Sequence, residues 1–548
     1  MSSANGRQDL SALGVQDLSA LGIQALVDPG KTPTDEQVRV IEAPRRPLLV
    51  VAGAGSGKTE TMSMRVLWLV ANHEDIAPSS VLGLTFTRKA AGELGDRLRQ
   101  RLALLARRVP SLRERLDEDP VSLTYNSFAE RIVAEHGMRI GIDPDFTMLT
   151  EAGAVDLMTQ IVEGWPTDLD EDLSPSAAVG HCLHLAGEVG EHGYTVEEAR
   201  DALEGFGRDL EQIGATNDTA RKTLRANARR LAYLGPVEEF QRRKREGGLL
   251  DFSDQLVLAT RIVRGAPAVR AQVRDEFQAV LLDEFQDTSV IQMELLSLLF
   301  HDHAVTAVGD PNQAIYGWRG ASASSLERFL DRFQDGPAQP GQTLTLSTAW
   351  RNDRNILRAA NRVAAPLREH SRAAKSPVLR ARPGAGEGRV DVAYTQDYRS
   401  ALGAVVDFVS AHRSRGTREG KRPTTAVLCR RRSDFPYVDM ALREAGVPTQ
   451  IVGLGGLLDQ PSVQDARAAL VLADDVEASP WLARLLAGID LDAADLVALG
   501  DWARHLAREE GRDPHRAVLL DAVDNPPEPG WSASGGARGR PAISGEAV

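Results

Sequence analysis

A chain of 548 residues is longer than one compact domain, so about three or four domains are expected. Its 42% apolar and 26% charged residues are typical of a folded globular protein, and no apolar run reaches the roughly 20 residues that a membrane-spanning helix needs. The net charge of −13 argues against a uniformly basic nucleic-acid binder, although a basic groove can lie on an acidic protein.

The N-terminal region has neither the basic nor the apolar part of an export signal. The two cysteines, Cys182 and Cys429, form no metal-type cluster and do not suggest a disulfide scaffold. We therefore expect a cytoplasmic protein without a membrane segment. Residues 8–14 and 16–22 repeat the heptapeptide QDLSALG, and we expect an N-terminal arm over residues 1–30 that is either mobile or a short helix.

From residue 34 onward, short apolar runs alternate with helical patterns. Continuous apolar strands separated by helices predict an α/β fold with a buried parallel sheet. In such sheets, ligands bind beyond the C-terminal ends of the strands. The apolar runs are 47–52 (PLLVVA), 81–86 (VLGLTF), 279–283 (AVLLD) and 304–309 (AVTAVG).

Three other regions differ from this pattern or resume it. Residues 129–247 are polar and helical in pattern, which predicts a helical insertion. The alternation resumes near Leu344 and again at 425–429 (TAVLC). The tail at 525–548 is rich in Pro, Gly, Ser and Ala and is expected to be disordered.

Residues 52–59 read AGAGSGKT between a predicted strand and a predicted helix, which is the context of a phosphate-binding P-loop. Glycines let the backbone wrap around phosphate oxygens, and the helix N-terminus adds partial positive charge. A glycine-rich turn with a chance Gly-Lys-Thr is the alternative. The expected ATP-binding residues of the loop are Ala52, Gly53, Ala54, Gly55, Ser56, Gly57, Lys58, which neutralises phosphates, and Thr59, which binds Mg²⁺.

Residues 280–288 (VLLDEFQDT) end an apolar strand in two acidic residues. Asp283 is expected to hold Mg²⁺ and Glu284 to polarise the attacking water. A strand that merely ends in acidic residues is the alternative. Downstream, residues 308–321 (VGDPNQAIYGWRGA) place Gln313 where it can sense the γ-phosphate, and Trp318 beside Arg319 suits stacking on single-stranded bases. A tight turn with one buried Trp is the alternative there.

Together these segments resemble the UvrD/Rep family of superfamily 1A helicases, in order from about Thr34 to Gly456. The resemblance implies RecA-like P-loop domains, ATP and Mg²⁺ as cofactors, and single-stranded and duplex DNA as partners. It also implies adenine recognition by Gln37, in TPTDEQ, and by Trp350, where the family has tyrosine. Arg351 would be the γ-phosphate arginine. Glu60 departs from the arginine that many members carry after the P-loop threonine.

The resemblance extends to three further segments. LTFTRKAA (84–91) is similar to motif Ia, and LTYNSFA (123–129) is similar to the family's TFHSFA. LLDFSD (249–254) is similar to LDFDD. The implied DNA contacts are Thr85, Phe86, Thr87, Arg88, Tyr125, Asn126, Tyr316, Trp318 and Arg319.

The same resemblance implies a division into domains. The first RecA-like domain, 1A, takes residues 31–128 and 248–343, and the helical insertion 1B takes 129–247. An incomplete second RecA-like domain, 2A, takes 344–451, a partial helical 2B takes 452–524, and the tail takes 525–548.

Runs such as YGWRGASA, AVLCRRRSDFP and VGLGGLLDQP look like the AdnB-type subunit of the actinobacterial helicase–nuclease. That likeness implies 3′→5′ translocation, work at DNA double-strand ends and a paralogous partner subunit. Neither motif V, nor motif VI, nor a nuclease pattern occurs between Leu457 and Val548, so we expect a C-terminally truncated chain. The expected function is an ATP-dependent DNA helicase or translocase in DNA repair, and the alternative is a nucleotide-dependent single-stranded DNA-binding fragment with little turnover.

Overall fold

The computed structural model describes residues 18–531 with internal gaps. The chain forms two compact units, residues 1–390 and 391–548, and each is described by itself. The gaps are 144–145, 168, 170–172, 215–216, 318–323, 335–339, 371–374, 414–422, 453–460, 489–490, 492, 515–516 and 529–530.

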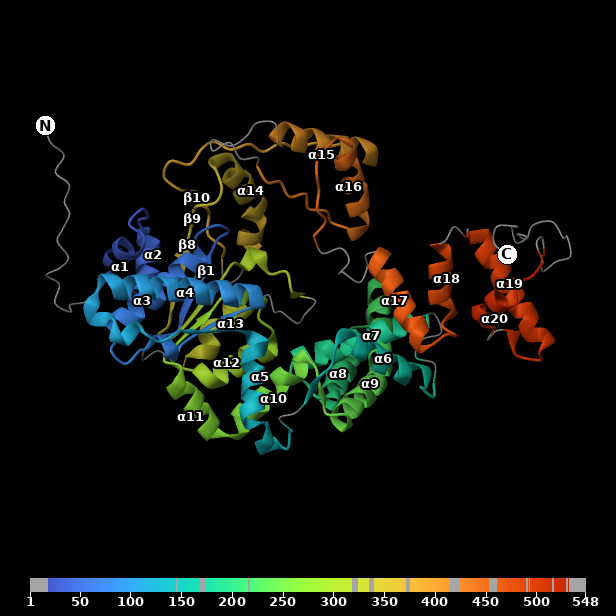
Figure 1. Ribbon diagram of the computed structural model, residues 1–548. Helices are drawn as coiled ribbons and strands as arrows, with labels where there is room; N and C mark the ends of the chain where they lie inside the picture. Colours follow the sequence, from blue (N-terminus) through green and yellow to red (C-terminus); the bar gives the residue numbers. More distant parts are fainter. Residues whose placement is uncertain are drawn as a thin grey trace. The chain divides into compact units, whose positions relative to one another are not determined.

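The first unit is built on a six-stranded sheet with the strand order β3-β2-β6-β7-β1-β8 (Figure 1). Every neighbouring pair in this sheet is parallel, which confirms the predicted α/β class with a buried parallel sheet. Each of the four predicted apolar runs contains one of its strands. The strands are β1 (Leu48–Ala52), β2 (Val81–Thr85), β3 (Val121–Thr124), β6 (Ala279–Leu282), β7 (Val305–Gly309) and β8 (Gln342–Leu346).

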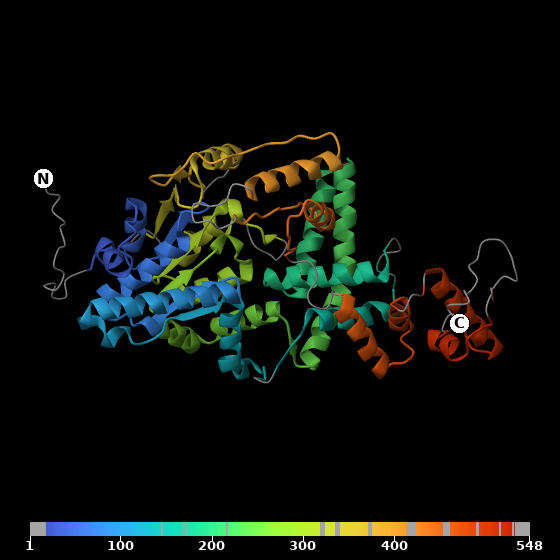
Figure 2. The same ribbon diagram turned by 45° about the horizontal axis from the view of Figure 1, so that its top comes forward.

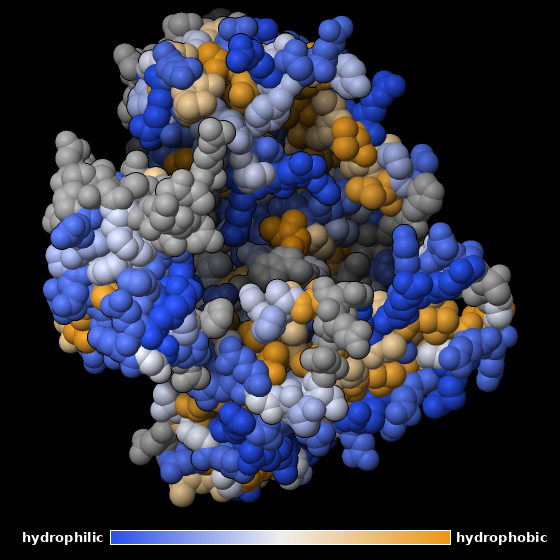
Figure 3. Space-filling view, turned by 90° about the vertical axis from the view of Figure 1, so that its right-hand side faces the viewer, coloured by the Kyte–Doolittle hydropathy of each residue, from blue (hydrophilic) through white to orange (hydrophobic). Residues whose placement is uncertain are grey.

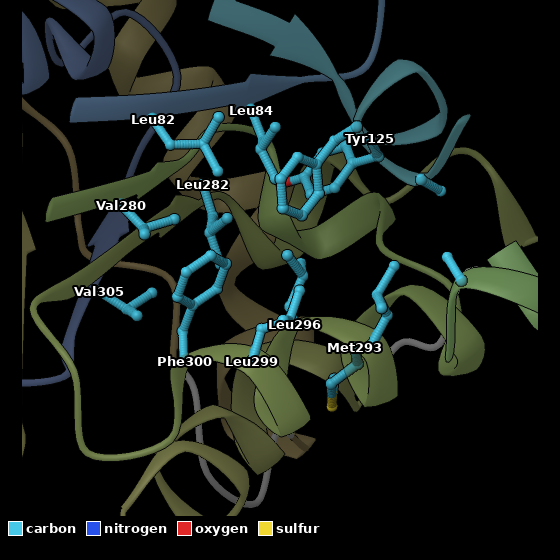
Figure 4. Packing of buried hydrophobic residues seen from close by; sticks show 14 of the residues in the cluster. Leu82, Leu84, Tyr125, Val280, Leu282, Met293, Leu296, Leu299, Phe300 and Val305 are labelled. Carbon is cyan, nitrogen blue, oxygen red and sulfur yellow. The ribbon is translucent and has the colours of Figure 1, made fainter. Parts of the chain in front are cut away.

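Two hydrophobic cores lie on the two faces of this sheet, because successive strand residues point to opposite sides. In β1, Leu49 and Val51 join one core, whereas Leu48 and Val50 join the other. The first core packs against α5 (Tyr125–His136), α10 (Phe252–Gly265), α11 (Pro267–Glu276), α12 (Val290–Phe300) and α13 (Ser325–Phe333), and Figure 4 shows part of it. The second packs against α1 (Ala20–Val27), α2 (Asp35–Ile41), α3 (Lys58–Asn72) and α4 (Arg88–Arg108).

The described part of the N-terminal arm contains the helix α1, which packs against the second core. Ala20 and Ile23 of α1 are fully buried in the second core. The Leu18 backbone is also hydrogen-bonded in both directions to the Asn72 side chain, at 2.6 and 2.9 Å. Of the two readings of this arm, the structure supports the short helix for residues 20–27.

Arg65 on α3 is a fully buried cation that ties three elements together. Its guanidinium donates to the Thr306 hydroxyl of β7 at 2.9 Å and to four backbone carbonyls at and after the end of α2. Burial lowers the pKa of Arg65 to about 10. The four carbonyl oxygens belong to Val40, Ile41, Ala43 and Pro44.

We expect Arg65→Met to lower the free energy of unfolding by about 3 kcal/mol or more, because it leaves several buried carbonyls without donors. Urea unfolding of the full chain measures this change. Arg39→Met, at an exposed arginine on α2, is the matched control and should stay within about 0.5 kcal/mol of the wild type. A variant at residue 65 that is as stable as this control would contradict the assigned role.

The helical insertion forms a core of its own, separate from both faces of the sheet. Its helices are α6 (Glu151–Glu163), α7 (Pro175–Glu191), α8 (Val196–Ile213) and α9 (Asp218–Glu246), and Figure 2 shows α9 as the long green helix. Met158, Cys182, Leu234 and Phe240 are among the buried residues of this core. Two short strands, β4 (Thr147–Met148) and β5 (Leu249–Leu250), pair with each other in parallel.

The LLDFSD segment carries the chain from the insertion back to the sheet. The buried Lys244 ammonium lies 2.8 Å from Asp254 and also contacts Asp251, and these two aspartates form the capping box of α10. Burial raises the pKa of Asp254, while the Lys244 charge holds the pKa of Asp251 below its usual value despite its own burial. This motif therefore stabilises the connection between α9 of the insertion and α10.

The strand near Leu344, β8, pairs with β1 and completes the first sheet, so the expected domain boundary at 343/344 falls within a strand. The chain continues through β9 (Thr348–Ala349) and α14 (Arg354–His370), and β9 pairs in parallel with β10 (Arg380–Ala381). Both two-residue strands lie in the first unit.

The second unit is helical over its described residues, and none of these residues is assigned to a strand. The TAVLC segment at 425–429, expected to be a strand, has no ladder partner among them. Its helices are α15 (Tyr398–Arg413), α16 (Phe435–Glu444), α17 (Pro461–Asp474), α18 (Ser479–Ala487), α19 (Ala493–Glu509) and α20 (Leu519–Asp524). Of the tail expected to be disordered, all but 525–528 and Trp531 lies outside the described residues.

The described helices include none whose length and apolar character would let it cross a bilayer. The face shown in Figure 3 is hydrophilic over much of its area, with smaller hydrophobic groups between the polar ones.

Candidate active site

The P-loop lies where the sequence predicts it, between the end of β1 at Ala52 and the start of α3 at Lys58. Gly55 and Gly57 have φ angles of 73° and 83°, which favour glycine. Gly57 offers no side-chain cap to α3, so the first amides of that helix are left for an anion. The buried Ser56 hydroxyl also has no hydrogen-bond partner among the described residues. This cradle fits a chain of phosphates.

Three predicted nucleotide contacts lie against the P-loop glycines. A Cβ atom added to Gly57 would lie 3.0 Å from Nε2 of Gln37 and 3.7 Å from Cδ1 of Trp350. A Cβ atom on Gly55 would lie 2.9 Å from Cβ of Arg351. The Trp350 backbone N–H donates to the Gly55 carbonyl at 2.8 Å. The loop therefore brings together residues that lie more than 300 positions apart.

The acidic residues after β6 face the same loop. Lys58 Nζ lies 2.6 Å from Oε2 of Glu284. Burial, reinforced by the Glu284 charge, raises the pKa of Asp283 to about 6. Glu284 has a φ angle of 50°, an uncommon conformation for a residue with a side chain. The two Mg²⁺ ligands predicted from the sequence, Asp283 and Thr59, lie directly after β6 and in the first turn of α3.

A chain of hydrogen bonds joins Glu284 to Gln313. Gln286 donates through Nε2 to Glu284 at 2.9 Å, and its Oε1 accepts the Asp310 backbone N–H at 3.0 Å. Gln313 then donates to the Asp310 carboxylate at 2.7 Å. The expected γ-phosphate sensor is therefore connected to the expected water-activating group through Gln286, which the sequence reasoning did not single out.

The predicted DNA contacts divide into exposed and buried groups. Arg88 and Thr87 are exposed, whereas Thr85 is buried and donates its hydroxyl to the Thr87 carbonyl. The Phe86 and Tyr316 rings are stacked, with centroids 5.8 Å apart and planes 6° apart. Trp318 and Arg319, also predicted to touch DNA, lie outside the described residues.

Tyr125 and Asn126 lie between this surface and the acidic residues. The structure buries Tyr125 to 3% exposure, so its ring belongs to the core rather than to an open surface. Asn126 accepts a hydrogen bond from Gln292 at 3.4 Å. Both residues line a pocket of about 430 Å³, together with Phe86, Arg88, Phe252 and Asp287.

Two further contacts at the P-loop were not foreseen from the sequence. Glu60, the departure from the family pattern, receives two hydrogen bonds of 2.7 Å from Arg101 on α4. Leu379 lies against the loop, because a Cβ atom on Gly53 would fall 2.1 Å from its Cδ2. The residues of these two pairs lie 41 and 326 positions apart in the sequence, so neither contact can be predicted from a local pattern.

Comparison with known proteins assigns the family. The model of the UvrD/REP helicase N-terminal domain matches residues 33–334, which is more than half of the chain. The chain belongs to the UvrD/REP helicase family. This result agrees with the parallel sheet and with the P-loop facing an acidic strand end.

Curated relatives of this UvrD/REP member are similar over most of its length. DNA helicase II of Escherichia coli is 27% identical over 489 residues, which cover 87% of this chain and 58% of that protein. ATP-dependent DNA helicase UvrD2 of Mycobacterium bovis is 28% identical over 500 residues, covering 90% and 64%. ATP-dependent DNA helicase PcrA of Staphylococcus epidermidis is 26% identical over 436 residues, covering 79% and 53%. The chain thus spans less than two thirds of these relatives.

Proposed function

We propose that this chain is the ATP-hydrolysing motor part of a DNA helicase or translocase. The observation that carries the proposal is the 2.6 Å contact between Lys58 of the P-loop and Glu284 of the acidic strand end. In this proposal, residues 31–128 and 248–343 supply motor domain 1A and 129–247 the insertion 1B. The chain after β8 supplies 2A and part of 2B.

In the proposed reaction, the backbone amides of the P-loop and of the first turn of α3 bind the phosphates of ATP. Lys58 exchanges the Glu284 carboxylate for phosphate oxygens, which releases Glu284 to orient water. Thr59 and Asp283 would hold Mg²⁺, which neutralises charge on the β- and γ-phosphates when bound. Gln37 and Trp350, whose side chains both lie beside Gly57, would hold the adenine.

Glu284 then takes the proton of the attacking water, and Arg351 offsets the charge that spreads over the transferring phosphoryl group. Gln313 senses the γ-phosphate and is coupled to Glu284 through Gln286 and Asp310. DNA binds beside the Phe86–Tyr316 stack with Arg88 on its phosphates. The likeness to AdnB-type subunits supports 3′→5′ movement, repair work at double-strand ends and a paralogous partner.

The test is steady-state ATP hydrolysis by the full chain with and without oligo(dT), with Lys58→Ala as the inactive control. The proposal expects turnover that rises with DNA and disappears in the Lys58→Ala variant. Turnover that does not respond to DNA would contradict a motor that moves along nucleic acid. Binding of ATP and oligo(dT) with negligible turnover would instead identify a nucleotide-dependent DNA-binding protein.

A further inference from the structure

Tyr125 stands where the related motif has an aromatic residue without a hydroxyl, and here the hydroxyl has a buried partner. The hydroxyl donates to the backbone carbonyl of Asp283 at 3.0 Å, across 158 positions of sequence. Figure 4 shows the Tyr125 ring at the edge of the core beside Leu84. Because Tyr125 is only 3% exposed, water cannot readily replace this hydrogen bond.

The Asp283 carbonyl belongs to the peptide that leads into Glu284. That peptide is unusual, because Glu284 has a φ angle of 50°, a left-handed conformation that is strained for a residue with a Cβ atom. Such a conformation persists only where neighbouring contacts hold it. A hydrogen bond to the Asp283 carbonyl holds this peptide in place and therefore helps to aim the Glu284 carboxylate.

The Tyr125 ring also packs against Phe86, which belongs to the candidate DNA surface. Its centroid lies 5.0 Å from the centroid of Phe86, and Phe86 stacks on Tyr316. Tyr316 is itself tied to the acidic segment, because its backbone N–H donates to the Asp287 carboxylate at 3.3 Å. A base that displaces or joins this aromatic stack would move the Tyr125 ring, which is packed between the stack and Asp283.

We infer that Tyr125 is a positioning residue that couples single-stranded DNA at the Phe86–Tyr316 stack to the orientation of Glu284. The inference rests on the proposed function and adds to it one path by which DNA regulates ATP turnover. Coupling of this kind is a difference in free energy between two sites, so it acts in both directions: DNA changes the nucleotide site, and nucleotide changes the affinity for DNA.

The test compares the full-length wild type with Tyr125→Phe, which keeps the ring and removes the hydroxyl. Tyr233→Phe is the matched control, because Tyr233 is 4% exposed in the separate core of the insertion. The ratio of ATP turnover with oligo(dT) to turnover without it should fall about five- to tenfold in Tyr125→Phe, the rate equivalent of one buried hydrogen bond. The KM for ATP should match that of the control.

A stimulation ratio in Tyr125→Phe equal to that of the wild type would overturn the inference. So would an equal loss of turnover with and without DNA, which would mean that the hydroxyl supports Glu284 without transmitting DNA binding. Either result would leave the proposed function intact, since the wild type would still show DNA-stimulated turnover.

A second measurement does not depend on turnover. The dissociation constant for fluorescent oligo(dT) is measured with and without Mg²⁺ and a non-hydrolysable ATP analogue. The inference expects a nucleotide-dependent shift in the wild type that shrinks at least threefold in Tyr125→Phe. A wild type without hydrolysis but with this shift would contradict the proposed function alone, whereas a shift that is absent in the wild type or unchanged in the variant would overturn the inference.

Discussion

Glu284→Gln is expected to lower the turnover number for ATP by about 10²- to 10⁴-fold, because an amide cannot take the proton of the attacking water. Affinity for ATP should stay the same or rise. The reason is that Lys58 lies 2.6 Å from Glu284, and loss of the carboxylate charge releases its ammonium group for the phosphates. Steady-state kinetics for turnover and fluorescent-nucleotide titration for affinity separate the two effects.

Glu387→Gln is the matched control, because Glu387 is an exposed carboxylate 3.0 Å from Arg354 and far along the chain from the acidic strand end. An exposed pair of this kind contributes at most about 1 kcal/mol, so the control should keep wild-type turnover. If Glu284→Gln weakened ATP binding as much as turnover, the carboxylate would serve the nucleotide site as a structural support and not as the base.

Arg351→Ala should reduce DNA-stimulated turnover by about 10³-fold or more, the usual effect of removing an arginine that stabilises the transferring phosphoryl group. The Arg351 Cβ atom is placed against Gly55 of the P-loop, and the residue is exposed, so its removal should leave the fold intact. Turnover at saturating ATP and oligo(dT) measures the effect, and thermal melting checks the fold.

Two variants bracket this result. Arg351→Lys keeps the charge but loses the planar guanidinium, so its turnover should lie between those of the wild type and Arg351→Ala. Arg354→Ala removes a nearby exposed arginine that pairs with Glu387, and it should behave like the wild type. Equal turnover in Arg351→Ala and Arg354→Ala would exclude Arg351 from the reaction.

The parts of the fold that the sequence predicts correctly are those set by local patterns. The strands before Gly53 and Asp283 are continuous apolar runs, and the glycine spacing of the P-loop has few other uses. The C-terminal ends of parallel strands lie at one edge of the sheet, so two such motifs in one chain can meet there. The 2.6 Å contact between Lys58 and Glu284 shows that their side chains do.

The parts that the sequence does not predict depend on partners distant in the chain. From its sequence, the segment at Leu344 is predicted to begin a second sheet. It instead pairs with β1 of the first sheet, which lies almost 300 residues earlier. The apolar segment at 425–429 reads as a strand, and yet a strand also needs a neighbour, which it lacks among the described residues. Tyr125 reads as a surface contact, because only the fold shows that its hydroxyl reaches Asp283.

The Glu60–Arg101 pair has a consequence for how this chain can evolve. Each 2.7 Å hydrogen bond joins a carboxylate beside the P-loop to a guanidinium on another helix. Replacement of Glu60 by arginine, the residue that the family resemblance implies there, would place two cations side by side, and loss of Arg101 alone would leave an unpaired carboxylate beside the P-loop. Each single substitution is therefore expected to disturb the nucleotide site, whereas a simultaneous change of both residues need not. The two positions are therefore expected to change together.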